Sequence, residues 1–153
     1  MTPRTDMGCL TRTPIALDDL LAAVGGPQYG GTCVFLGTVR AGPTDADVTA
    51  IEYSAYDAMA EAEIERLLAE TRVRWPEARV ALRHRLGRVP VGEASIAIVA
   101  VAAHRADAFA ACRYVIDEAK VRVPVWKKEL RIDGTTTWVE PSGTPPPVSA
   151  HGA

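Results

Sequence analysis

Hydrophobic and polar residues follow each other along this chain with two different periods. Apolar residues recur at helical spacing over 57–75 and again over 104–121, and a proline that prevents continuation follows each segment. A shorter helix is predicted over 17–24, where two glycines close it. The chain therefore contains three predicted helices.

Strands are predicted between these helices and after the last one. They cover residues 32–40, 50–55, 79–88, 94–103, 125–132 and 135–139, with a hairpin turn at Asp133-Gly134. Segment 79–88 alternates, which is typical of a half-buried strand, whereas 94–103 is almost continuously apolar and suits a central strand covered on both faces. Strands and helices mix without a regular βαβ cadence, and no glycine-rich loop opens a helix. We expect an α+β fold with a mainly antiparallel sheet.

The length and composition fit one globular domain. Of the 153 residues, 48% are apolar and 24% charged, and we expect the domain to span 15–140, between a flexible lead-in (1–14) and a disordered Pro- and Gly-rich tail (141–153). The net charge of -2 argues against bulk nucleic-acid binding. No apolar run is long enough to span a membrane or to serve as a secretion signal, so we expect a cytoplasmic protein without membrane contact.

The three cysteines do not indicate a sulfur or metal site. Cys9, Cys33 and Cys112 are odd in number and widely spaced, unlike a disulfide framework or a CxxC motif. We expect them to be reduced, with Cys33 and Cys112 packing as small apolar side chains. No HExxH sequence, serine elbow or carboxylate pair with histidine is present, so a metal site is not expected.

Lysine is rare and clustered. Only three of the seventeen basic residues are lysines, and all lie between positions 120 and 128. In an extended segment after Pro124, Lys127 and Glu129 share one face while Lys128 lies on the other, so the two adjacent lysines must have different roles. A solvated basic turn is the alternative, but Pro124 and Trp126 favour a fixed, partly buried setting in which an amine has a depressed pKa.

Further candidate groups would suit an anion. His104 and Arg105 lie where a buried strand passes into a helix N-terminus, although a simple cap with a solvated arginine explains them equally well. Arg40 ends a strand that contains a glycine and could hold a phosphate or carboxylate. His84 is expected to be a satisfied, half-buried strand residue. Together these groups suit an anionic substrate and proton transfer or carbonyl chemistry near a lysine.

Three sequence blocks carry a family resemblance. F-x-G-x-V-R at 35–40, HR-x-x-AF at 104–109 and ID-x-x-K-x-x-x-P-x-WKKE at 116–129 resemble the MoaE family, the large catalytic subunits of molybdopterin synthase. The likeness covers roughly residues 15–140. It implies a single α+β domain of the α/β hammerhead type. It also implies a central dimer of two large subunits, with a small ubiquitin-like subunit at each end of a heterotetramer.

The same resemblance implies a reaction and a set of roles. The small subunit would insert a C-terminal Gly-Gly tail, activated as a thiocarboxylate, and its sulfur would move to cyclic pyranopterin monophosphate to build the molybdopterin dithiolene. Lys120 and Lys127 would be catalytic and contact the substrate, and Glu129 would support proton transfer or lysine orientation. Arg40, His104 and Arg105 would bind the pterin and its phosphate. No cofactor or metal is implied.

Two other functions remain open on the residues alone. One is a non-catalytic anion-binding or scaffold module that uses the basic cluster to hold a partner's C-terminal tail. The other is lysine-dependent acyl or imine chemistry on a phosphorylated metabolite.

Overall fold

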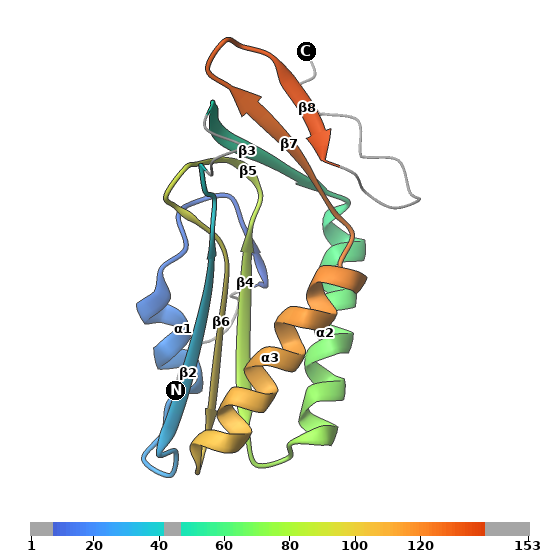
Figure 1. Cartoon of the computed structure of the whole chain (residues 1–153). Coiled ribbons are helices and arrows are strands. Elements are labelled where there is room, and N and C mark those ends of the chain that lie inside the picture. The colour runs from blue at the N-terminus through green and yellow to red at the C-terminus, as the bar shows by residue number, and fades with distance from the viewer. Residues whose placement is uncertain (1–7, 42–46, 140–153) are drawn as a thin grey trace.

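The computed structural model describes residues 8–41 and 47–139, which form three helices and two four-stranded sheets (Figure 1). The predicted α+β class with mainly antiparallel strands is confirmed. The expectations for 1–7 and for the tail 141–153 lie outside the described residues.

The first sheet has the strand order β1-β4-β6-β2. Its members are β1 (Leu10–Thr11), β4 (Arg79–Arg85), β6 (Ala94–Ala102) and β2 (Gly31–Thr38). Neighbouring strands are antiparallel, except that β1 runs parallel to β4. β6 is the central strand predicted from its apolar run, because alternate side chains pack into separate clusters on the two faces of the sheet.

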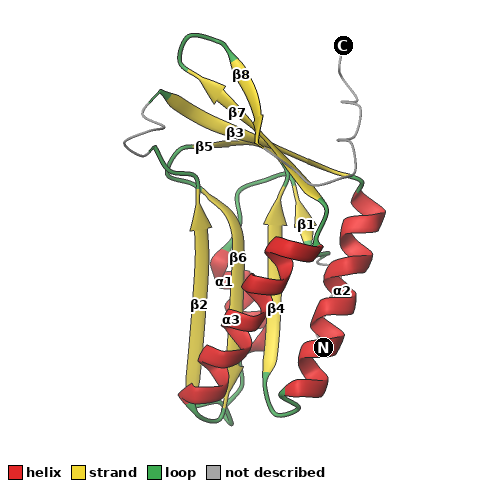
Figure 2. Cartoon of the chain, turned by 45° about the vertical axis from the view of Figure 1, so that its right-hand side comes forward, coloured by secondary structure: helices red, strands yellow, loops and turns green. Residues whose placement is uncertain are grey.

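The second sheet is entirely antiparallel and has the order β5-β3-β7-β8. Its members are β5 (Gly87–Pro90), β3 (Val48–Ala55), β7 (Val125–Arg131) and β8 (Thr136–Val139). In Figure 2 this sheet lies across one end of the first sheet, as a head lies across a handle.

The helices cover the two faces of the first sheet unequally. α1 (Leu17–Val24) packs on one face, and α2 (Asp57–Arg74) and α3 (Arg105–Arg122) pack on the other (Figure 2). Arg122 ties α3 to α2 through Glu70 at 2.7 Å and Glu63 at 3.0 Å. This network fixes the C-terminal end of α3. No helix of the described residues is long and apolar enough to cross a membrane.

The structure corrects two expectations about strands. The predicted strand 79–88 is divided: β4 belongs to the first sheet and β5 to the second, because Gly87 has a φ of +89° that redirects the chain. Leu10–Thr11, expected in a flexible lead-in, pairs with β4, and the amide of His84 donates to the Cys9 carbonyl at 2.7 Å. Two residues are too few for a sequence period to reveal.

Candidate active site

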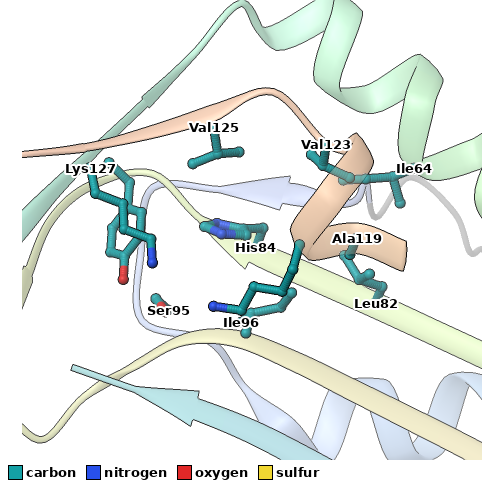
Figure 3. Close-up of a pocket in the computed structure, with 11 residues that line it drawn as sticks. Ile64, Leu82, His84, Ser95, Ile96, Ala119, Val123, Val125 and Lys127 are labelled. Carbon is teal, nitrogen blue, oxygen red and sulfur yellow. The ribbon is translucent and has the colours of Figure 1, made fainter. Parts of the chain in front are cut away.

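Two adjoining pockets lie where the sheets meet the end of α3. The helix-side pocket has a volume of about 80 Å³ and is drawn in Figure 3. Its walls are Tyr53, Ile64, Leu82, His84, Ser95, Ile96, Ala119, Lys120, Val123, Val125 and Lys127. The strand-side pocket, of about 300 Å³, adds residues from the end of β2 and from the second sheet, including Gly37, Arg40 and Glu129. Lys120 and Lys127 line both pockets.

The two lysines come from different elements. Lys120 lies in the last turn of α3, and Lys127 lies on β7, which the chain enters directly after Pro124. Burial lowers the pKa of Lys127, and so does the nearby charge of Lys120, while Glu129 opposes the shift. The depressed amine pKa expected in this segment is therefore confirmed for Lys127.

Lys128 has a different setting. Its Nζ lies 3.8 Å from the Glu52 carboxylate and 5.3 Å from the centre of the Trp138 ring. It lines neither pocket, whereas Lys127 and Glu129 share the strand-side pocket. The prediction that Lys127 and Lys128 lie on opposite faces of an extended segment is confirmed.

Glu129 is held in place by an arginine. Its Oε1 accepts from Arg131 at 2.8 Å, and the same guanidinium reaches Asp47 at 3.3 Å. The charge of Glu129 raises the pKa of Lys127, and Glu129 is anchored by a partner outside the pocket. This arrangement suits the orientation of Lys127 better than a free acid would.

Arg40 follows β2 and lines the strand-side pocket. The preceding residue, Val39, is clamped by backbone bonds to Glu93 at 3.0 Å and Gly92 at 2.7 Å, and Arg85 holds Glu93 through an ion pair of 2.7 Å. The exposed Arg40 side chain is therefore carried on a fixed backbone.

Positive charge dominates the strand-side pocket. Within 8–41 and 47–139, no carboxylate forms an ion pair with Arg40, Lys120 or Lys127. Glu129, the carboxylate that the described part of the chain places in the wall, is already paired with Arg131. Unneutralised cations of this kind attract an anionic ligand.

Gly37 gives this pocket part of its shape. A Cβ at this position would lie 2.8 Å from Cγ2 of Ile96, which lines both pockets. The absence of a side chain at Gly37 therefore leaves room for a side chain of the neighbouring strand.

His104 and Arg105 do not join the other candidate residues within one chain. They form the N-cap and the first residue of α3, at the opposite end of the helix from Lys120 (Figure 1). Sixteen residues at about 1.5 Å each put roughly 24 Å between His104 and Lys120. Both are exposed and line neither pocket. Within one chain the structure therefore brings Arg40, Lys120 and Lys127 together, and the rigid helix α3 keeps His104 and Arg105 apart from them.

Comparison with known proteins decides the family. The sequence model of the MoaE protein family matches residues 10–122. A molybdopterin synthase catalytic subunit of Bos taurus is 40% identical over 128 residues, which cover 84% of this chain and 68% of that protein. The chain belongs to the MoaE family. The family indicated by the three sequence blocks is thereby confirmed.

Solved structures of the family share the fold. The crystal structure of molybdopterin synthase from Staphylococcus aureus matches with a TM-score of 0.83 and 29% identity, covering 90% of this chain and 99% of that one. A complex of subunits 1 and 2 of the molybdopterin-converting factor from Helicobacter pylori matches with a TM-score of 0.70 and 20% identity, over 86% of this chain and 88% of that one. The latter shows a shared fold.

The cysteines of this family member lie away from the pockets. All three are free thiols packed in or against the core cluster between the first sheet and α2 and α3. Burial raises the pKa of Cys9 and Cys112 to about 12, which disfavours the reactive thiolate. No group of three metal-ligating side chains that could hold an ion occurs in the described residues.

Sequence reasoning undervalued His84. It is half-buried, as predicted, but its side chain lines the helix-side pocket, next to the two lysines. The alternation of β4 places His84 on the same face as Leu82, and that signal was available in the sequence. What the sequence could not show is that the end of α3 and β7 cover this face.

Proposed function

We propose that this chain is the large subunit of a molybdopterin synthase. It moves sulfur from the thiocarboxylated C-terminus of a small ubiquitin-like subunit to cyclic pyranopterin monophosphate. The observation that carries the proposal is the meeting of Lys120 and Lys127 at the wall shared by two pockets, beside cations suited to an anionic substrate. Family membership supplies the reaction to which this geometry is matched.

The lysines fit the chemistry of the partner's tail. Sulfur transfer breaks the bond between sulfur and the tail's acyl carbon, and an oxygen from water replaces it, so that the tail leaves as a carboxylate. Negative charge develops on the acyl oxygen during this exchange, and fixed ammonium groups stabilise such charge. Because its pKa is lowered, Lys127 releases a proton more readily than an ordinary lysine does, which suits proton exchange with the substrate.

The strand-side pocket suits the phosphorylated pterin. Arg40 can grip a phosphate with two parallel N–H donors, and Glu129 keeps Lys127 in position. Sulfur arrives on the partner, so no thiol of this chain is needed, and no metal or other cofactor enters the proposal. We place the reaction in the cytoplasm.

His104 and Arg105 can contribute only from a second copy of the chain. A dimer of large subunits is part of the proposed assembly, and the length of α3 excludes these residues from the pocket of their own chain. Two variants can test this. Lys120→Ala and Arg105→Ala chains, each impaired alone, should recover activity when mixed, because a mixed dimer holds one intact site. Failure of the mixture to recover, with dimers exchanging, would contradict the shared site.

Reconstitution tests the function as a whole. The purified chain is mixed with thiocarboxylated small subunit and cyclic pyranopterin monophosphate, and molybdopterin is measured. We expect product in the presence of both. Binding of the small subunit without turnover would favour the scaffold alternative, and no engagement would favour a different lysine-dependent reaction on a phosphorylated metabolite.

A further inference from the structure

His84 has a defined tautomer. Its Nδ1 lies 2.9 Å from the backbone carbonyl oxygen of Arg85, and because a carbonyl can only accept, Nδ1 must carry the proton. Burial and the charges of Lys120 and Lys127 lower the pKa of His84 to about 4, so the ring is neutral near pH 7. The second ring nitrogen, Nε2, therefore has a free lone pair.

In the part of the chain that the structure describes, no group donates a hydrogen bond to that lone pair. Within the described residues, no hydrogen bond to Nε2 is formed, and the ring is fixed by an edge contact with Tyr53, 5.3 Å between centroids at 72°. The other neutral polar groups of the pocket are engaged: Ser95 donates to the Gly37 carbonyl at 3.3 Å and interacts with the Tyr53 hydroxyl. Nε2 is an acceptor fixed beside a pocket without a partner of its own.

The rest of the helix-side pocket is lined by apolar side chains and by two lysines. One side is apolar: Ile64, Leu82, Ala119, Val123 and Val125. The pocket is also lined by Lys127 (Figure 3) and by Lys120, whose ammonium groups can only donate. A ligand that enters with both N–H and C=O groups can satisfy its oxygens on the lysines. It needs a separate acceptor for an N–H.

Building on the proposed function, we propose that Nε2 of His84 accepts a hydrogen bond from a backbone amide N–H of the partner's extended C-terminal tail. This bond holds the tail's terminal acyl group beside Lys120 and Lys127. A Gly-Gly tail offers no side chains, so only its backbone groups can be recognised, and an amide N–H taken into an apolar pocket without an acceptor is costly. His84 is thus a positioning residue for the sulfur donor.

The test is a double-mutant cycle between the full-length chain and the small subunit in its carboxylate form, measured by calorimetry. The partner is prepared with its native tail or with an ester oxygen replacing the last peptide N–H. In the chain, His84→Phe keeps an aromatic ring against Tyr53 but removes the acceptor, and Tyr53→Phe is the matched control. We expect His84→Phe to weaken the native tail about tenfold, the effect of roughly one hydrogen bond.

The ester-tailed partner separates recognition from packing. It should bind the unaltered chain about as weakly as the native tail binds His84→Phe, and His84→Phe should weaken it no further. Tyr53→Phe should preserve the difference between the two tails. Equal weakening of both tails by His84→Phe, or no weakening of either, would overturn the proposal.

A second measurement needs no substitution. In the chain with ¹⁵N-labelled histidine, the Nε2 resonance of His84 should move when the native tail binds and stay unchanged with the ester tail. An unchanged resonance with the native tail would count against the bond even if His84→Phe fails to fold. Sulfur transfer by the unaltered chain without any coupling in the cycle would remove this inference alone. No binding and no turnover with the native, thiocarboxylated partner would remove the proposed function as well.

Discussion

The two faces of β7 carry adjacent lysines in opposite electrostatic situations. Lys128 lies on the face where Glu52 and the Trp138 ring receive its charge. Lys127 lies on the pocket face, where burial and Lys120 disfavour its charge and only Glu129 supports it. A single strand thus holds one lysine that is paired with a carboxylate and one lysine whose charged form is disfavoured.

The difference shows what separates a structural charge from a reactive one. A partly exposed ion pair such as that of Lys128 with Glu52 contributes about 1 kcal/mol or less to stability. A cation kept beside another cation in a pocket must be stabilised by the fold, and perturbed groups of this kind gather at functional sites. The α2–α3 network around Arg122 holds the Lys120 end of the helix against this repulsion.

The largest effect should come from removing a lysine that lines the pockets, compared with removing Lys128 on the other face. Lys127→Ala and Lys120→Ala should each reduce kcat for molybdopterin formation about 100- to 1000-fold, as loss of a group that stabilises developing charge does. Lys128→Ala should change it by less than about threefold. Reconstituted turnover measures all three, with circular dichroism to confirm folding. Loss of turnover in a folded Lys128→Ala chain would invert the comparison.

A smaller effect should follow when Glu129, whose charge favours the protonated form of Lys127, is neutralised. Glu129→Gln takes away the charge that raises the pKa of Lys127, so that pKa should fall further. The limb of the kcat–pH profile that reports the lysine should move to lower pH, and turnover should fall by less than it does in Lys127→Ala.

Glu52→Gln is the matched control for Glu129→Gln, because it removes the partner of Lys128 on the other face. It should leave the profile in place. A shift of equal size in both variants would mean that the two faces are not electrically distinct.

Much of this comparison could be predicted from the sequence. Alternation alone separated Lys127 and Glu129 from Lys128, and helical spacing located α2 and α3 to within a residue or two. Both signals are local. The three sequence blocks indicated the family. A sequence motif carries no distances, however, so His104 and Arg105 were grouped with lysines from which the length of α3 separates them.

The role of His84 could not be predicted for a related reason. Periodicity indicated the face of β4 on which it lies, but three segments distant in sequence decide what covers that face: the end of α3, β3 and β7. The turn at Gly87 also sends the next strand into the other sheet. Tertiary contacts of this kind leave no period in the sequence.

The reach of the pocket charges can be measured at His84. Lys127→Met should raise the pKa of His84 from about 4, because one of the nearby cations is lost, whereas Lys128→Met should leave it unchanged. An NMR titration of the ring resonances gives both values. Identical titration curves in the two variants would show that Lys127 does not act on His84.

The same shift affects stability. Between pH 6.5 and about 4 the unfolded chain binds a proton at His84 that the folded chain does not, so the folded state loses stability as the pH falls through this window. In Lys127→Met the loss should be smaller, because the folded pKa lies closer to the unfolded value. Urea unfolding at pH 7, 5.5 and 4.5 checks the sign.

The smallest effect on turnover is expected where neither face of β7 is touched. Replacing Cys9, Cys33 and Cys112 together by Ala should retain sulfur transfer, since these thiols pack with the core cluster and line neither pocket. Truncation of the buried Cys112 should lower the free energy of unfolding by about 1 to 3 kcal/mol. Turnover is therefore measured well below the melting temperature, beside a Cys112→Ser variant, whose side chain is close to cysteine in size. If the triple variant folded with a native spectrum yet formed no molybdopterin, a thiol of this chain would have to carry the sulfur. Lys120 and Lys127 would then only assist the reaction of that thiol.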